Sequence, residues 1–137
     1  MPDKVLKIII SSFSYKQNKP LEDPVHGCGF VFDLRGIDNP GRLESFKKLT
    51  GQDKEVVAYL TTGTMMKEYL LHCISLIDIT VNNYVERSFT LLHINFGCTG
   101  GQHRSVFAAE YTAAHLTEKY NIVVTVIHQN KGNWVQP

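Results

Sequence analysis

The stretch that decides the fold covers residues 89–128 and reads FTLLHINFGCTGGQHRSVFAAEYTAAHLTEKYNIVVTVIH. Residues 89–96 are almost continuously apolar, which predicts a buried strand. From about residue 102 to residue 120 an Ala-rich stretch carries apolar residues at helical spacing, and residues 122–128 predict another strand. A strand, a helix and a strand in this order form a right-handed crossover that joins two parallel strands.

Two more strands are predicted before this unit. Residues 5–11 are β-branched and apolar, and residues 29–34 read GFVFDL. A polar loop rich in lysine and proline separates them. The second strand ends near Asp33 and leads into RGIDNPG, where Asn-Pro and two glycines indicate a loop. Loops that follow the carboxyl ends of parallel strands are where open α/β sheets bind ligands.

Two helices are predicted between residues 53 and 87. Asp53 is a suitable N-cap for a short helix over residues 54–61, and Thr64 for a longer one that ends near Arg87. In the longer helix, residues spaced by three and four predict the face that packs on the core: Met65, Tyr69, His72, Leu76, Ile79 and Asn83. A strand over residues 77–85 is the alternative, because β-branched residues are dense there.

These elements predict an α/β fold, a three-layer α/β/α sandwich with a small, mostly parallel sheet, and one domain over residues 1–137. No apolar run approaches the roughly 18–20 residues that cross a bilayer, so no membrane association is expected. Fourteen basic and thirteen acidic residues give a net charge of +1, which does not favour binding to nucleic acid or a membrane surface. Three cysteines without a close pair predict reduced thiols and a cytoplasmic location.

The loop GCTGGQHRS, residues 97–105, predicts an anion-binding site between a strand and a helix. Its glycines let the backbone approach a ligand closely, and the start of the helix offers unpaired N–H groups and partial positive charge. Thr99 and Ser105 add hydroxyls, His103 adds a donor that depends on pH, and Arg104 can grip a phosphate with two hydrogen bonds. The simpler alternative is a glycine-rich turn that only reverses the chain.

Cys98 and Arg104 are separated by five residues and followed by Ser105, which is the spacing of the cysteine phosphatase signature. In that chemistry a thiolate nucleophile lies in a cradle of N–H groups, and Asp33 would be a candidate general acid. The alternative is that Cys98 is a small buried residue at a strand end, as most free cysteines are. We therefore rank ligand binding ahead of catalysis.

Four blocks of the sequence resemble the C-terminal domain family of the RNase adapter protein RapZ. They are SFSYK followed by a proline (Ser12–Pro20), VFDLRGIDNP (Val31–Pro40), LTGQDKEV (Leu49–Val56) and GCTGGQHRS (Gly97–Ser105), in the family's order. The resemblance covers nearly the whole chain. It implies a fold related to a phosphofructokinase subdomain, a sensor of the amino-sugar phosphate glucosamine-6-phosphate, and binding of small regulatory RNAs by the full-length protein.

Carried over residue by residue, the resemblance implies a phosphate side and a sugar side of one pocket. The phosphate side is Cys98, Thr99, Gly100, Gly101, Gln102, His103, Arg104 and Ser105, and the sugar side is Asp33, Arg35 and Asn39. Asp33 could accept protons from hydroxyl or ammonium groups, and pairing with Arg35 is the rival role for its carboxylate.

The sequence departs from the family pattern in two places. Nothing matches GxxxxGK[ST], so the N-terminal Walker-type domain is expected to be absent, and no nucleotide cofactor is carried over. Relatives place arginines around the histidine of the last strand, whereas here Ile127 and Gln129 flank His128, which makes RNA binding doubtful. A protein partner or a homo-oligomer remains open. The histidines lack metal-ligand spacing, so no metal site is predicted.

Overall fold

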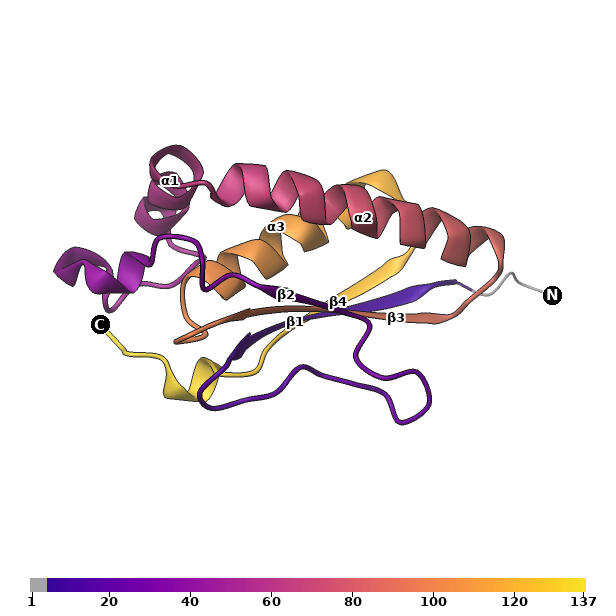
Figure 1. Cartoon of the computed structure of the whole chain (residues 1–137), viewed down its shortest axis with the longest axis horizontal. Helices are drawn as coiled ribbons and strands as arrows, with labels where there is room; N and C mark the ends of the chain where they lie inside the picture. The colour runs from indigo at the N-terminus through magenta and orange to yellow at the C-terminus, as the bar shows by residue number, and fades with distance from the viewer. Residues whose placement is uncertain (1–4) are drawn as a thin grey trace.

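A computed structural model of the chain describes residues 5–137, and a sheet of four parallel strands lies at its centre (Figure 1). The strands are β1 (Lys7–Ser14), β2 (Phe30–Asp33), β3 (Leu91–Cys98) and β4 (Val123–His128), in the spatial order β2-β3-β1-β4. Each neighbour is parallel, with Ser14 opposite Cys98 and Ser12 opposite His128. The carboxyl ends of all four strands therefore meet at one edge of the sheet.

Three α-helices of the described chain lie over one face of this sheet (Figure 1). They are α1 (Lys54–Gly63), α2 (Met66–Glu86) and α3 (Arg104–Lys119). The connections from β2 to β3 and from β3 to β4 step across the sheet in the same direction. Because such crossovers are right-handed, both place their helices on the same face.

A long loop between β1 and β2 covers part of the opposite face. The side-chain amide of Asn95 on β3 holds this loop, accepting from the Leu21 N–H and donating to the carbonyls of Leu21 and Cys28. The predicted α/β class and the small parallel sheet are confirmed. The second outer layer of the sandwich is this loop rather than another set of helices.

The core lies between the sheet and the helices, but α2 packs with a different face from the one predicted. Its buried residues are Met66, Leu70, Cys73, Ile74, Ile77 and Val81. The predicted packing face is open to solvent instead, with Met65, Leu76 and Ile79 each more than half exposed. Both stripes have helical spacing, and the buried one is more uniformly apolar. The alternative strand over residues 77–85 is wrong, because α2 is helical throughout.

Two strands extend further toward their carboxyl ends than predicted. β1 continues beyond Ser11 through Ser12 and Ser14, which are buried, and β3 continues through Gly97 and Cys98. The prediction stopped short because serines and a glycine interrupt the apolar run at these ends. The strands continue there because the hydrogen-bonded ladder between β1 and β3 needs no apolar side chains. Short 3-10 helices η1 (Pro40–Arg42), η2 (Glu44–Phe46) and η3 (Lys131–Asn133) lie near this edge of the sheet. No helix within residues 5–137 is long and apolar enough to cross a membrane.

Candidate functional site

The loop between β3 and α3 is held by its carbonyl oxygens. All six carbonyls from Cys98 to His103 accept a hydrogen bond from the surrounding protein. In chain order the donors are Tyr15 N (3.0 Å), Ser14 Oγ (2.7 Å), Asn130 Nδ2 (2.9 Å), Trp134 Nε1 (2.8 Å), Gly51 N (2.9 Å) and Phe107 N (3.0 Å). With the carbonyls fixed in this way, the N–H groups of residues 99–105 have no hydrogen-bond partner within residues 5–137. An unpaired row of amides at a helix start is suited to bind an anion.

A cavity of about 320 Å³ lies against this loop. Its lining is contributed by three segments: Asn39, Gly41 and Lys47 before α1, the loop residues Cys98, Thr99, Gly100, Gln102 and His103, and Val135 near the C-terminus. Lys47 is the cation of this lining, and its ammonium group pairs with the Glu44 carboxylate, just outside the lining, at 2.9 Å. None of the lining residues is itself a carboxylate, so the lining carries no negative charge that would repel an anion.

Two glycines fit the backbone of the loop and of its support. Gly101 has a φ of +64°, a conformation that side chains other than glycine rarely adopt, and a Cβ there would lie 3.0 Å from the Ser14 amide nitrogen. Gly51 donates its N–H to the Gln102 carbonyl, and a Cβ on it would meet the His103 carbonyl oxygen at 2.2 Å. The Leu49–Val56 block thus supports the loop by close backbone contact.

Residues 129–135, which we call the C-terminal strap, buttress the loop from the other side. Asn130 and Trp134 bind the carbonyls of Gly100 and Gly101, and Val135 exchanges hydrogen bonds with the Gln102 side chain. Trp134 is 9% exposed and its ring lies 5.8 Å from that of His128. Trp134 is therefore a structural contact of the loop rather than an open surface.

The side chains of Gln102, His103 and Arg104 bind the backbone of residues 34–49. Gln102 Nε2 donates to the Leu49 carbonyl at 2.8 Å, and His103 Nε2 lies 2.8 Å from the Phe46 carbonyl. One guanidinium nitrogen of Arg104 donates to the carbonyls of Leu34, Arg35 and Ile37 at 3.4, 3.1 and 2.7 Å. These three residues thus hold the segment that carries Asn39, Gly41 and Lys47 over the cavity.

Arg104 is 4% exposed and lies outside the lining of the cavity. One of its terminal nitrogens donates to carbonyls of the loop after β2. Fewer guanidinium N–H groups are therefore left for the two hydrogen bonds to phosphate that the sequence predicts. Its Nε is buried without a hydrogen-bond partner within residues 5–137. The charge of Arg104 thus lies behind the anion loop.

Cys98 and Ser105 meet beneath the loop. The Cys98 Sγ donates to the Ser105 Oγ at 3.1 Å, and both residues are buried. Cys98 contributes to the cavity lining, whereas Ser105 does not. The Ser105 hydroxyl therefore accepts a hydrogen bond from the thiol beneath the loop.

The imidazole of His103 lines the cavity, in surroundings that favour its neutral form. Burial lowers the pKa of its imidazole below the ordinary value, although the hydrogen bond to Phe46 opposes this shift. A carbonyl oxygen only accepts, so Nε2 carries the proton. Nδ1 is then an acceptor, and this side of the ring lies beside Gly41.

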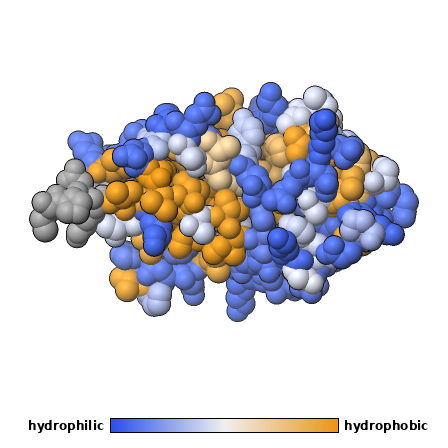
Figure 2. All heavy atoms as spheres, turned by 180° about the vertical axis from the view of Figure 1, so that it is seen from behind, coloured by the Kyte–Doolittle hydropathy of each residue, from blue (hydrophilic) through white to orange (hydrophobic). Residues whose placement is uncertain are grey.

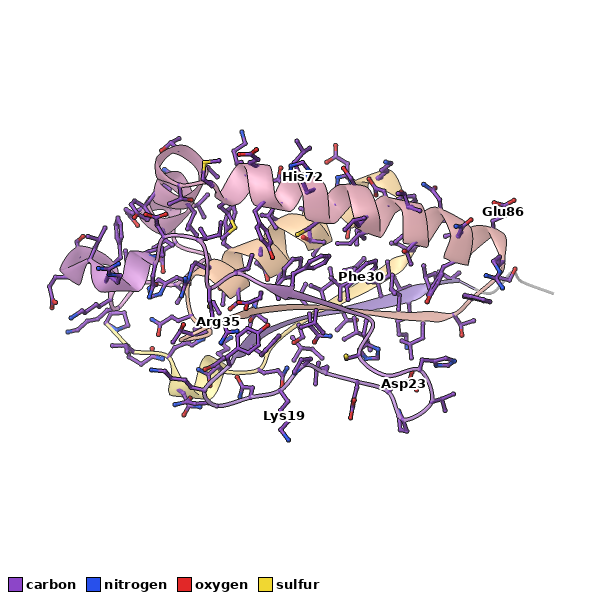
Figure 3. The ribbon with its side chains drawn as sticks, in the orientation of Figure 1. Lys19, Asp23, Phe30, Arg35, His72 and Glu86 are labelled. Atoms are coloured by element: carbon purple, nitrogen blue, oxygen red, sulfur yellow. The ribbon has the colours of Figure 1, made fainter. Side chains whose placement is uncertain are left out.

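The predicted sugar side divides into two parts. Asn39 lines the cavity and caps η1 by accepting from the Gly41 N–H at 2.9 Å. Asp33 and Arg35 instead form a half-exposed ion pair, 2.7 Å between Oδ2 and a guanidinium nitrogen, outside the lining. The hydrogen bonds from Arg35 hold the pKa of the Asp33 carboxyl below its usual range. The Arg35 guanidinium also stacks 3.9 Å from the centre of the Tyr15 ring, at the carboxyl end of the sheet (Figure 3).

Sequence reasoning did not find Gly41, Lys47 and Val135, which complete the lining of the cavity. Lys47 is one of two adjacent lysines in a polar stretch, and Val135 lies beyond the last strand, so neither has a local signal. Gly41 follows the Asn-Pro turn and is the most predictable of the three. No group of three His, Cys, Asp or Glu side chains in residues 5–137 could hold a metal ion.

The structure defines a class: a parallel α/β domain with a glycine-rich strand-to-helix loop whose amides are free at the carboxyl edge of the sheet. The chain belongs to the RapZ C-terminal domain family, whose model matches residues 6–132. This confirms the resemblance found in the sequence.

The chain is similar to bacterial proteins named nucleotide-binding proteins. It is 33% identical over 121 residues, 88% of the chain, to one from Methylococcus capsulatus, and 38% identical over 107 residues, 78% of the chain, to one from Acetivibrio thermocellus. It is 37% identical over 116 residues, 85% of the chain, to one from Acidobacterium capsulatum. The matched region spans 39%, 35% and 36% of these three relatives.

Proposed function

We propose that this domain binds a phosphorylated small molecule, with the phosphate against the free N–H groups of residues 99–105. The observation that carries the proposal is the engagement of all six carbonyls from Cys98 to His103, which leaves the amides free beside the cavity. The start of α3 adds partial positive charge, and Lys47 adds an ammonium group for which the ligand would compete with Glu44. A phosphate monoester matches this arrangement better than a carboxylate, because it has three oxygens to accept from several amides.

The finer proposal is that the ligand is an amino-sugar phosphate such as glucosamine-6-phosphate, and that its occupancy is relayed to a partner. The family resemblance supports the identity of the sugar. The Asp33 carboxylate, half-exposed at the next strand end, is the acceptor to which an ammonium group of the ligand would bind, in competition with Arg35. The cavity volume of about 320 Å³ falls in the range of small-ligand sites.

The name of the relatives suggests a nucleotide as the competing ligand. This chain corresponds to little more than a third of those proteins, and its sequence lacks a Walker-type loop. We therefore propose that a nucleotide is not the ligand of this domain. ATP and GTP belong in the binding test as competitors.

Calorimetric titration tests the proposal. We expect glucosamine-6-phosphate to bind, glucosamine to show no heat of binding, and inorganic phosphate to compete weakly. Binding of glucosamine as tight as that of its phosphate would contradict the role of the loop. Preference for glucose-6-phosphate over glucosamine-6-phosphate would overturn only the amino-sugar assignment, and tighter binding of ATP or GTP would favour the nucleotide.

A pair of glycine variants separates the loop from general effects of substitution. Gly101→Ala forces a side chain into a left-handed backbone at a cost of about 1–2 kcal/mol, which should weaken binding by roughly tenfold. Gly27→Ala is the matched control, because Gly27 also has a positive φ, +78°, a Cβ there has no atom within 4 Å, and it lies in the loop between β1 and β2. Equal losses in both variants would show that the loop geometry is not what binds the phosphate.

A cysteine-dependent phosphatase is the second candidate function, favoured by the place of the Cys98 thiol at the cavity. Two contacts weigh against it: Arg104 is engaged by backbone carbonyls, and Asp33, the candidate general acid, is paired with Arg35. Hydrolysis of p-nitrophenyl phosphate by the wild type, lost in Cys98→Ser, would establish the enzyme.

RNA binding ranks third. Only Lys131 adds positive charge to the strap beside the site, so we expect structured RNA to bind no better than about micromolar at physiological salt, in the nonspecific range. Nanomolar, sequence-selective binding in a gel-shift titration would overturn this expectation. The three free cysteines support a cytoplasmic location, which we also propose.

A further inference from the structure

A second cavity, of about 370 Å³, lies between the start of α1 and the first turns of α3. It is lined by Gly51, Gln52, Val57, Phe107, Glu110 and Tyr111, none of which lines the cavity at the anion loop. Both helices start at the end of the molecule away from the N-terminus (Figure 1), whereas the apolar surface visible in Figure 2 gathers beside the N-terminal residues. This cavity is therefore set off from that apolar surface, and its volume is that of a small-ligand site.

The Glu110 carboxylate at this cavity is held in place by a chain of hydrogen bonds. Its Oε2 accepts from His128 Nε2 at 2.8 Å, and the other ring nitrogen of His128 lies 2.6 Å from the Ser12 hydroxyl. Ser12 is fully buried and the His128 side chain is 10% exposed, so the imidazole is fixed between its two partners. The Glu110 side chain is 42% exposed, and its Oε1 has no hydrogen-bond partner within residues 5–137. The carboxylate thus offers a free oxygen that a ligand does not have to order.

Two aromatic rings line the cavity beside this carboxylate. Phe107 and Tyr111 are one turn apart on α3, and their ring centroids lie 5.8 Å apart. Phe107 is buried, whereas Tyr111 is 41% exposed, so the tyrosine is the ring that a ligand can cover. The face of an aromatic ring attracts a cation, and a carboxylate attracts it more strongly. Together they form a site for a positively charged group.

No cation of the described chain occupies this position. The cation–aromatic contacts within residues 5–137 are made elsewhere, by Arg35 with Tyr15, Arg87 with Phe89, and Lys119 with Tyr120. The salt-bridge partner of Glu110 is the imidazole of His128, which carries charge only when it is protonated. Asp53 and Lys54 follow Gln52 outside the lining and offset each other's charge. The charge of the lining is therefore the negative charge of Glu110.

We propose that this cavity binds an organic cation whose guanidinium group donates to Glu110 Oε1 and lies against the Tyr111 ring. A guanidinium fits best because it is flat: it stacks on a ring while its N–H groups point sideways toward the carboxylate. A metal ion fits less well, since one carboxylate supplies too few ligands. The apolar side chains of Val57 and Phe107 suit a short alkyl chain attached to the charged group. The guanidinium can belong to a free alkylguanidine or to an arginine side chain of another protein.

This cavity lies directly behind the anion loop. Gly51 and Phe107, which line it, donate their N–H groups to the carbonyls of Gln102 and His103. A cation in the cavity would contact the residues that hold the anion loop without entering the cavity where the anion is proposed to bind. The two sites are separate, but they share supporting residues.

Titration of the 137-residue chain with butylguanidinium, followed by its amide NMR signals, tests the site. We expect saturable shifts at about millimolar concentration, centred on residues 51–52 and 107–111. Butylurea, a neutral analogue of the same shape, should bind at least tenfold more weakly. Equal binding of butylurea, or shifts centred on another part of the chain, would overturn the proposal. No phosphorylated ligand is present, so the result does not depend on the proposed function of the anion loop.

Three variants on α3 identify the groups that bind the cation. Glu110→Gln keeps an acceptor for His128 but removes the charge, and it should weaken butylguanidinium binding by roughly tenfold. Tyr111→Leu removes the exposed ring and should weaken binding by roughly threefold. Glu118→Gln, an exposed glutamate two turns after Glu110, is the matched control and should bind like the wild type. Wild-type affinity in Glu110→Gln, or an equal loss in Glu118→Gln, would show that the cation does not bind at this carboxylate.

A blocked Gly-Arg-Gly peptide distinguishes the two sources of the guanidinium in the same titration. Binding at least tenfold tighter than that of butylguanidinium, with the same residues shifted, would identify an arginine of a partner protein. Tighter or comparable binding of butylguanidinium would identify a free alkylguanidine. A peptide and a butylguanidinium that both fail to shift residues 107–111 would overturn the site.

Discussion

Replacing Trp134 by Phe tests whether the C-terminal strap holds the anion loop in its binding geometry. The substitution keeps an aromatic ring near His128 but removes the indole N–H that donates to the Gly101 carbonyl at 2.8 Å. That carbonyl belongs to the residue with a φ of +64°, and its donor comes from a side chain that is 9% exposed. The variant therefore leaves a largely buried acceptor unpaired at the position where the loop conformation is least favourable.

The structure allows the size of the effect to be worked out in two parts. An unpaired buried carbonyl costs about 1–3 kcal/mol, and the smaller ring adds about 1 kcal/mol of lost packing. The free energy of unfolding should fall by about 2–4 kcal/mol, which lowers Tm by roughly 10 °C. If the freed peptide must be ordered again on binding, at about 1–2 kcal/mol, the affinity for the phosphorylated ligand should fall by roughly 5–30-fold.

Thermal unfolding and calorimetry measure these two quantities, and Tyr120→Phe provides the control. Tyr120 follows the far end of α3 and donates its hydroxyl to Asp78 at 2.9 Å, so its loss removes one hydrogen bond without touching the loop. We expect the control to lose about 1 kcal/mol of stability and no affinity. An unchanged affinity in Trp134→Phe, or an equal loss of affinity in both variants, would refute the positioning role of the strap. In the wild type Trp134 is the single tryptophan, so its fluorescence also reports binding.

Three further predictions concern the residues of the QHR cluster and the thiol beneath it. Arg104→Ala should lower the free energy of unfolding by about 3–5 kcal/mol as well as weaken binding, because it removes the hydrogen-bond donors of buried carbonyls in the loop after β2. Undiminished stability in urea unfolding would contradict this prediction. Cys98→Ser should leave ligand affinity within about twofold by calorimetry, since the amides carry the binding; a tenfold loss would implicate the thiol. Burial lowers the pKa of His103, so its imidazole binds a proton more tightly in the unfolded chain, and its contribution to stability is lost as pH falls below about 6.5. Tm measured from pH 7.5 to 5 should therefore fall less in His103→Gln than in the wild type. Parallel curves of Tm against pH would disprove the lowered pKa of His103.

Much of the fold could be predicted from the sequence because its signals are local. The four strands and three helices follow from apolar runs, helical spacing, Asp53 before α1, and the turn RGIDNPG. The parallel arrangement follows from the crossover unit of residues 89–128 and the right-handedness of such connections. What the sequence did not show was the layer opposite the helices. The order β2-β3-β1-β4, which puts both crossover helices on one face, depends on pairings between distant segments.

The position of the candidate site was predictable, but the roles of its residues were not. Glycines and a helix start mark an anion loop wherever they occur, and residues 98–103 do line or adjoin the cavity. A sequence does not show where a guanidinium or an amide side chain points. The sequence predicts Arg104 and Gln102 as ligand-binding residues, but it does not show that their side chains also bind the backbone of residues 34–49. The two stripes of α2 pose the same difficulty, since spacing alone does not choose between them.

The support of the anion loop comes from segments that are far apart in the chain, and this has a consequence for binding. Ser14, Gly51 and Asn130 each fix one of its carbonyls: Ser14 ends β1, Gly51 precedes α1, and Asn130 follows β4. The amides are thus oriented before any ligand arrives, so binding does not have to pay for ordering them. The segment of residues 34–49 is held in another way than the loop. Its backbone carbonyls near Asn39 and Lys47 accept hydrogen bonds from side chains of the loop. A ligand that contacts the amides together with Asn39 or Lys47 would therefore bridge the loop and this segment across the cavity.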